Sequence, residues 1–331
     1  MDINEIKLII EENYNINVKS IIKVKNSYKV EADEGEYCVK KINYDFPHFN
    51  FIISAISHLQ KKQFKTIPEI ILNNKGKNYI KIDESYGYLT KWIPSRVSNF
   101  NNPIELQKVS RKLAEFHLCS RGFNINRDMN PRIGWFSWVN VFNTRCSEIL
   151  DFRKRIYQKA HRSEFDKIYL ENIDNEIKRG ERAVEGLLNN NYFNLMNKEV
   201  RNLGFCHHDY AHHNILIDQN QQINIIDFDY CILDTHLHDV SSLLIRAMKD
   251  GKWNEKTSNL IIDSYREALD INSDEFKIMK YFIMFPQSFW QIGLQYYWEQ
   301  QNWEEEVFIN KIMRYLEDIE YREGFLEEYF K

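Results

Sequence analysis

The side chains best suited to chemistry lie in two neighbouring stretches of this chain. His207, Asp209 and Asn214 form a His-x-Asp-x-x-x-x-Asn pattern, and Asp227 follows at the end of the next apolar run. A carboxylate can accept the proton of a hydroxyl group, and carboxylate and amide oxygens are the ligands that Mg²⁺ prefers. A base combined with two magnesium ligands is suited to the transfer of a phosphoryl group to a hydroxyl.

A short loop and a β-hairpin must position these side chains. The apolar residues 215–217 predict one strand, the polar residues 218–222 a turn, and residues 223–226 the returning strand. Asp209 and Asn214 then lie at opposite ends of one loop, and Asp227 leaves the neighbouring strand. We expect the three side chains to converge on one open volume. This loop and hairpin are typical of kinase folds.

The rest of the chain predicts an α+β, bilobal architecture. Residues 1–93 alternate in the manner of antiparallel strands, with a first helix that Asp2 can cap and a second helix at 49–60. They are expected to form a small lobe, which is the nucleotide-binding lobe if the fold is that of a kinase. Residues 94–331 are mostly helical and carry the catalytic-type segment 207–229. The cleft should lie where the chain crosses over, near Lys91 to Pro94.

Composition excludes several classes of protein. The 331 residues are 43% hydrophobic and 14% aromatic, which is typical of a globular protein, and the formal charge of -4 argues against a nucleic-acid binder. The longest apolar runs are too short to span a membrane. Five scattered cysteines without a C-x-x-C pair indicate reduced thiols. The acidic start, Met1–Glu5, predicts synthesis in the cytoplasm without a signal peptide.

Several motifs together resemble a known family. The chain is similar to the aminoglycoside-phosphotransferase/choline-kinase branch of the protein-kinase-like superfamily, and within it to the CotS-type spore coat proteins of endospore-forming bacteria. The motifs that carry the resemblance are Tyr37–Lys41, Lys91–Arg96, Leu113–His117, Cys206–Tyr210, Ile226–Asp229 and Asp234–Asp239. The resemblance implies a location in the spore coat, with other coat proteins as partners.

The resemblance also implies a role for each site residue. Lys40 would contact the phosphates of ATP, and Asp209 would orient or deprotonate an acceptor hydroxyl. Asn214 and Asp227 would bind Mg²⁺. Lys91, Trp92 and Ile93 would offer backbone groups to the adenine. The acceptor would be a hydroxyl of a small molecule or a polysaccharide.

Lys40 is preferred over Lys41 as the lysine of the cleft. Alternation along the strand puts the two on opposite faces, and Val39 then faces the core. The helix at 49–60 has no Glu or Asp, so it offers Lys40 no ion-pair partner. We expect the ammonium to bond a backbone carbonyl, a hydroxyl of Ser54 or Ser57, or water. This predicts weak to moderate nucleotide affinity and slow or absent transfer.

Further departures leave alternatives open. Lys25–Tyr28 stands where a glycine-rich phosphate loop would be. Asp229 is interpreted as a hydrogen-bonding support; a role as a metal ligand is the alternative. The histidines at 207, 208, 212 and 213 are expected to support the loop or face solvent; a zinc site is the alternative. At the level of the protein, the alternatives are a non-catalytic coat scaffold and a soluble choline- or sugar-type metabolic kinase.

Overall fold

The structure, a computed structural model, describes residues 3–331, so the expected cap at Asp2 lies outside it. The chain forms two compact units. The first contains the described residues up to 133 together with 202–233, and the second contains 134–201 and 234–331. The boundary expected at 93/94 does not coincide with this division. The segment 207–229 belongs to the same unit as the N-terminal strands.

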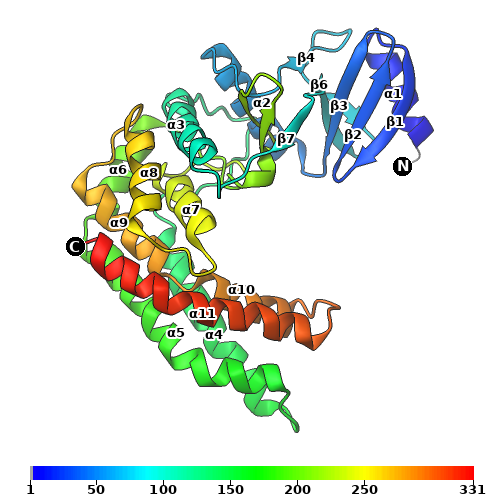
Figure 1. The fold of residues 1–331 in the computed structure, drawn as a ribbon. Helices are drawn as coiled ribbons and strands as arrows, with labels where there is room; N and C mark the ends of the chain where they lie inside the picture. Colours follow the sequence, from blue (N-terminus) through cyan, green and yellow to red (C-terminus); the bar gives the residue numbers. More distant parts are fainter. Residues whose placement is uncertain (1–2) are drawn as a thin grey trace. The chain divides into compact units, whose positions relative to one another are not determined.

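The first unit is built on an antiparallel sheet of six strands, in the order β1-β2-β3-β6-β4, with β5 also paired to β6 (Figure 1). Its strands and helices are α1 (Ile3–Asn13), β1 (Val18–Val24), β2 (Ser27–Ala32), β3 (Gly35–Ile42), α2 (Phe46–Lys61), β4 (Ile70–Ile71), β5 (Ile80–Ile82), β6 (Ser85–Lys91) and α3 (Pro103–Ser120). Helix α1 contributes Ile6, Ile10 and the nearby Tyr14 to a core shared with Val30 and Val39 of the sheet. One face of the sheet is therefore closed by α1.

A second, three-stranded sheet of the same unit carries the loop and hairpin. Its order is β7-β8-β9, formed by β7 (Ser95–Val97), β8 (Ile215–Asp218) and β9 (Ile223–Ile225). A short 3-10 helix, η1 (His212–Asn214), leads into β8. The expected hairpin is present. Strand β7 escaped sequence analysis because its three residues are all exposed and show no alternation.

The second unit is entirely helical in its regular structure. It comprises α4 (Trp138–Gln158), α5 (Glu164–Asn189), α6 (Tyr192–Asn202), α7 (Leu237–Met248), α8 (Glu255–Arg266), α9 (Ser273–Met284), α10 (Gln287–Gly293), the π-helical turn η2 (Leu294–Trp298) and α11 (Glu305–Tyr329). Helices α4, α5, α10 and α11 share one buried cluster, to which Phe152, Tyr169 and Phe289 contribute large rings. Figure 1 shows the long helices α4 and α5 running side by side, with α10 beside α11.

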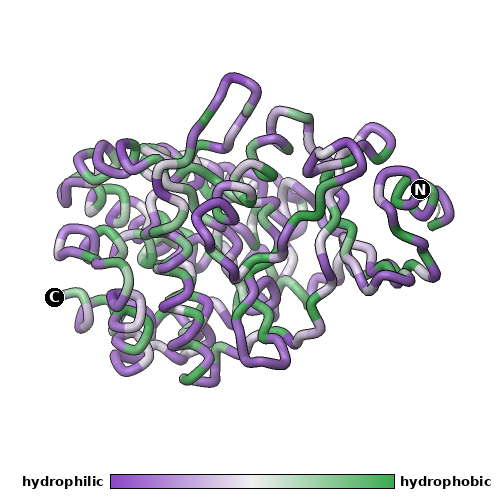
Figure 2. Tube along the Cα trace, turned by 90° about the horizontal axis from the view of Figure 1, so that it is seen from above, coloured by the Kyte–Doolittle hydropathy of each residue, from purple (hydrophilic) through white to green (hydrophobic). Residues whose placement is uncertain are grey.

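The predicted α+β class, with antiparallel strands and many helices, is confirmed. Hydrophobic residues occur as short stretches between hydrophilic ones along the trace (Figure 2). Among residues 3–331, no helix combines the length and the apolar character needed to cross a lipid bilayer.

Candidate active site

Hydrogen bonds connect the loop at 207–214 to the residue that follows β9. The His207 ring bonds the carbonyl of Ile226 through Nε2 at 2.9 Å, and the Ile226 N–H donates to the Asn214 carbonyl at 3.0 Å. Tyr210, fully buried, donates its hydroxyl to the carbonyl of Val109 in α3 at 3.0 Å. These bonds fix the backbone from which Asp209 and Asn214 project.

Asp209 and Asn214 are in direct contact. The Asn214 amide nitrogen donates to the Asp209 carboxylate (Oδ2, 2.8 Å) and to its backbone carbonyl (3.0 Å). The amide oxygen of Asn214 is therefore the atom left to bind another group. The Asp209 carboxylate also lies 3.7 Å from the His213 ring.

Asp227 is held in an uncommon backbone conformation. Its φ is +66°, in the left-handed region that Asp and Asn tolerate better than most residues. Its carboxylate accepts a bond from Lys40 at 3.0 Å, and its side chain is 31% exposed. Strained backbone held by surrounding structure is common at functional sites.

Lys40 has two carboxylate partners. Its ammonium lies 3.0 Å from Asp227 Oδ1 and 3.1 Å from Asp229 Oδ2, and its side chain is only 8% exposed. Burial lowers the pKa of the Lys40 ammonium, but the carboxylates of Asp229 and Asp227 outweigh it and raise the pKa above its ordinary value. Burial also raises the pKa of the Asp229 carboxyl to about 6, against the opposing effect of Lys40.

This pairing corrects the expectation for the lysine. Helix α2 does lack a carboxylate, but the ammonium bonds Asp227 and Asp229, not a carbonyl or a serine. Ser54 and Ser57 instead bond Asn50 and the Ile53 carbonyl within α2. Lys40 is therefore not unpaired, and the expectation of slow or absent transfer, which depended on an unpaired lysine, no longer has this support.

The strand register agrees with the predicted faces of β3. Val39 is fully buried in the core under α1, whereas Lys40 lines a cavity on the other face. Lys41 is not among the residues that line this cavity, and its ammonium lies 3.6 Å from the exposed carboxylate of Asp83.

The predicted site residues surround one cavity of about 500 Å³, which is within the usual range of roughly 300–1,000 Å³ for small-molecule pockets. The lining includes the polar side chains of Lys40, Asp209, Asn214 and Asp227. It also includes a set of apolar and aromatic side chains: Val24, Ile67, Tyr88, Trp92, Ile93, Val97, Leu216 and Ile226. This combination suits a ligand that has both a flat apolar ring and charged groups.

The segment 91–93 lines the same cavity. The Trp92 N–H donates to the Glu36 carbonyl at 3.0 Å, and the Ile93 carbonyl accepts the Ser95 hydroxyl at 2.8 Å. Two of the backbone groups expected to meet an adenine are therefore already bonded within the protein. The turn at Lys25–Ser27, which replaces a glycine-rich loop, also borders the cavity.

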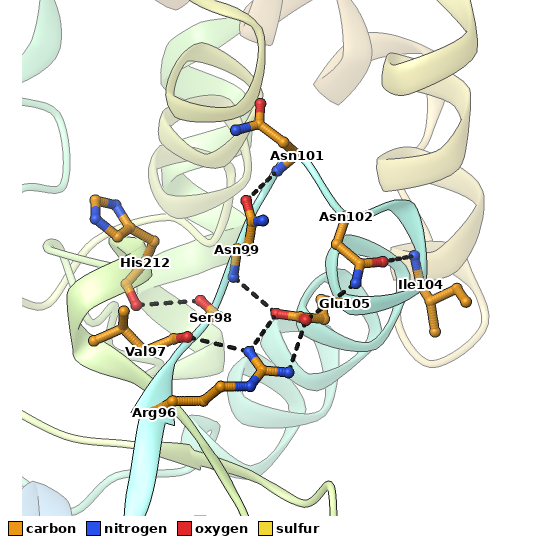
Figure 3. Close-up of polar contacts among 9 residues, drawn as sticks. All are labelled: Arg96, Val97, Ser98, Asn99, Asn101, Asn102, Ile104, Glu105 and His212. Atoms are coloured by element: carbon orange, nitrogen blue, oxygen red, sulfur yellow. Dashed lines mark hydrogen bonds and ion pairs between the residues drawn. The ribbon is translucent and has the colours of Figure 1, made fainter.

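A network at the start of α3 braces the loop (Figure 3). Arg96 makes two bonds to Glu105, which also accepts the Asn99 N–H at 2.8 Å. The Arg96 guanidinium holds the pKa of the Glu105 carboxyl below its ordinary value. From the same segment, Ser98 donates its hydroxyl to the His212 carbonyl at 3.1 Å and its N–H to the Ile215 carbonyl at 2.8 Å. Sequence analysis missed this bracing, which no spacing rule signals.

The donor set fits a hard divalent cation. Asp227 presents a partly exposed carboxylate and Asn214 an amide oxygen, both bordering the cavity that Lys40 enters. Oxygen ligands of this kind suit Mg²⁺. Within the described chain, the histidines at 207, 208, 212 and 213 do not form a metal-type cluster with one another. The alternative of a zinc site there is not supported.

Comparisons with known proteins identify a family and a relative of this chain. A family model described as "Spore coat putative kinase YutH" matches residues 7–329. Spore coat protein S from Bacillus subtilis (strain 168) is 20% identical over 303 residues, which cover 91% of this chain and 86% of that protein.

Solved structures show the same fold. An aminoglycoside phosphotransferase from Alicyclobacillus acidocaldarius subsp. acidocaldarius DSM 446 superposes with a TM-score of 0.83 at 18% identity, covering 96% of this chain and 93% of that one. A spectinomycin phosphotransferase in complex with ADP and spectinomycin superposes with a TM-score of 0.65 at 13% identity, covering 98% of both chains. The predicted kinase-like fold and the predicted resemblance are thus confirmed.

Proposed function

This chain belongs to the family described as "Spore coat putative kinase YutH", and we propose that it is a spore coat phosphotransferase that uses ATP and Mg²⁺. It would transfer a phosphoryl group to a hydroxyl of a small molecule or a polysaccharide. The observation that carries the proposal is the contact of Lys40 with Asp227 beside the Asp209–Asn214 pair, around one cavity. The similarity of the chain to spore coat protein S supports a role in the spore coat.

The polar residues divide the work of the reaction. Asp209 accepts the proton of the acceptor hydroxyl, and the Asn214 N–H bonds orient its carboxylate. Lys40 neutralises charge on the nucleotide phosphates. Asp227 and the Asn214 amide oxygen would hold Mg²⁺. When bound, the cation neutralises the charge that develops on the phosphate oxygens.

The apolar wall of the cavity accepts the base of the nucleotide. Because the Trp92 N–H is bonded to Glu36, the base would meet the remaining backbone groups of Lys91 and Ile93. The side chains assigned to the phosphates, the cation and the acceptor border the same cavity as these backbone groups.

A label-transfer experiment tests the proposal. The full chain is incubated with Mg²⁺ and γ-labelled ATP, together with a panel of hydroxyl compounds and with coat material from spores that lack the protein. We expect label in an acceptor, and Asp209→Asn should reduce transfer by roughly 10²–10⁴-fold, the usual contribution of a general base. Nucleotide affinity should change little in this variant, because the role proposed for Asp209 is toward the acceptor hydroxyl and not toward the nucleotide.

Two outcomes would contradict the proposal. Nucleotide binding without transfer to any coat component or hydroxyl compound would favour a non-catalytic coat scaffold. Fast transfer to a common free alcohol or sugar, with none to coat material, would favour a soluble metabolic kinase.

A further inference from the structure

Kinase folds need their lysine fixed in place, and this chain lacks the usual device. In protein kinases, the strand lysine is tied to a glutamate of the neighbouring helix. Helix α2 has no acidic residue from Phe46 to Lys61. It packs instead through apolar side chains such as Phe49, Ile52 and Ile56, all buried.

Asp227 cannot replace the missing carboxylate once a cation is present. It lies 3.0 Å from the Lys40 ammonium, but it is also the partly exposed carboxylate of the site. A divalent cation would draw this carboxylate, because a double charge attracts it more strongly than a single ammonium does. Lys40 then needs a second anionic partner that does not bind the cation.

Asp229 has the geometry of that second partner. Its Oδ2 lies 3.1 Å from the Lys40 ammonium, and its side chain is 19% exposed against 31% for Asp227. Asp229 is not among the residues that line the cavity, whereas Asp227 is. Its other oxygen, Oδ1, is buried without a hydrogen-bond partner in the described chain. That oxygen can take another N–H of the ammonium when Asp227 turns to the cation.

The backbone of Asp229 is held in place from both sides. Arg132 reaches the Asp229 carbonyl through Nη1 at 3.5 Å, and its guanidinium lies over the rings of Tyr44 and Tyr230 at 5.2 and 5.5 Å. The preceding Phe228 is 2% exposed and packs against the His207 ring at a centroid distance of 5.0 Å. The turn that carries Asp229 is thus fixed by packing.

We propose that Asp229 is the positioning residue of Lys40, supplying from the turn after β9 the carboxylate that protein kinases place on a helix. The inference rests on the proposed function, since it concerns how Lys40 is held for a nucleotide. One turn then carries both the cation ligand, Asp227, and the partner of the lysine. It follows that no carboxylate of α2 takes part in the ion pair of Lys40.

Calorimetric titration of the full chain with a non-hydrolysable ATP analogue, with and without Mg²⁺, tests the proposal. Asp229→Asn and Lys40→Met should each lower affinity for the magnesium complex about tenfold or more, a change of at least about 1.4 kcal/mol. The double variant should bind no more weakly than Lys40→Met, because the two residues act through one contact. Lys41→Met, on the same strand, should match the wild type.

A charge-keeping variant separates positioning from mere packing. Asp229→Glu should retain more affinity than Asp229→Asn, although glutamate is the larger residue and fits the buried space less well. The opposite order would show a packing role and overturn the proposal. Losses of affinity that multiply in the double variant would also overturn it. The same holds if Asp229→Asn loses only the magnesium-dependent part of nucleotide binding, which is the result expected of a cation ligand.

If the wild type binds no nucleotide, the proposed function is contradicted, but the pairing of Asp229 with Lys40 is not. A second measurement tests this pairing without a nucleotide. In the ligand-free protein, Lys40→Met leaves two carboxylates facing each other and should lower the thermal midpoint. Adding Asp229→Asn should recover part of that loss. No recovery would mean that Asp229 does not pair with Lys40.

Discussion

The Asp227 carboxylate is bonded to Lys40 and is also the side chain best exposed to a cation. Its positive φ of +66° means that an asparagine can replace it without backbone strain, whereas most other residues cannot. Replacement by asparagine therefore removes the charge of the Asp227 side chain while keeping its shape and the backbone conformation. The site therefore offers a clean substitution at the residue that we propose as a cation ligand.

We predict that Asp227→Asn removes the gain in nucleotide affinity that Mg²⁺ provides and leaves the fold intact. The physical reason is the loss of the charged oxygen ligand at an unchanged backbone. Nucleotide titration at several magnesium concentrations measures the gain, and circular dichroism checks the fold. Asp83→Asn is the matched control, because Asp83 also has a positive φ, +54°, but is exposed and outside the cavity. A magnesium response retained in Asp227→Asn would contradict the assignment.

A second prediction concerns pH and the helical unit. Glu199 of α6 accepts bonds from the ring and the backbone N–H of His236, at 3.1 and 3.3 Å. Burial alone would raise the pKa of the Glu199 carboxyl, but the bonds and charge of His236 lower it from 4.5 to about 2. Because the folded-state pKa lies below the unfolded one, this carboxylate stabilises the fold above about pH 4.5. That contribution is lost as pH falls toward 2.

Glu199→Gln should therefore lower the free energy of unfolding at pH 7 by roughly 1–3 kcal/mol, the cost of removing a buried charged hydrogen bond. The difference from wild type should shrink between pH 4.5 and 2. Urea unfolding at a series of pH values measures both. A difference that stays constant over this range would show that the carboxylate charge does not contribute.

At the scale of helices and strands, the close approach of α5 to α9 depends on one glycine. A Cβ built on Gly186 of α5 would overlap the ring of Tyr281 of α9. Glycine normally costs a helix up to about 1 kcal/mol relative to alanine, so its presence in the long helix α5 needs such a reason. Gly324 of α11 has no such neighbour within 4 Å in the described chain.

We predict opposite effects of the same substitution at these two sites. Gly186→Ala should destabilise the protein by about 1–3 kcal/mol, because the helices must separate or the ring must move. Gly324→Ala should stabilise it by about 0.5–1 kcal/mol through helix propensity. Chemical unfolding followed by circular dichroism compares them. Equal shifts of one sign would mean that α5 and α9 do not pack this closely.

Some elements could be predicted from the sequence and others could not. The hairpin β8–β9 was accessible because its apolar runs are short, separated by a polar turn, and preceded by a motif of fixed spacing. Helix α2 was predicted to start at 49 but begins at Phe46, since Asp45 caps it by accepting the His48 N–H. The carboxylate partners of Lys40 could not be predicted from the sequence, because Asp227 lies 187 positions away along the chain and no spacing rule connects it or Asp229 to the strand of Lys40.

At the scale of the whole molecule, the chain enters the first unit twice. The segment 134–201 belongs to the helical unit, and the chain then returns at 202 to supply the loop and hairpin. The return is closed by bridges between Cys206 and Ile232 and between Ile133 and Leu233. The residues that line the cavity therefore all lie in the first unit, although the segment 134–201 separates them along the chain.

The position of the cavity in the first unit predicts which segments a bound nucleotide protects. In hydrogen exchange, the magnesium complex of a non-hydrolysable ATP analogue should slow exchange in the segments that line the cavity, at 24–27, 88–97, 213–216 and 226–230. Protection should be largest for those amides at the cavity edge that are exposed to solvent in the ligand-free protein. Protection absent from all four segments would place any nucleotide elsewhere on the protein.

The most direct test of the central claim is the thermal unfolding midpoint of the full chain titrated with ATP and Mg²⁺. Binding to the folded state alone must raise stability, by about 2.7 kcal/mol when ATP reaches a hundred times its dissociation constant. The account predicts a saturable rise that needs both ATP and Mg²⁺, is preserved in Lys41→Met, and is strongly reduced in Lys40→Met and Asp227→Asn. No rise at millimolar ATP, or the same rise in Lys40→Met as in Lys41→Met, would contradict a nucleotide site built around Lys40 and Asp227.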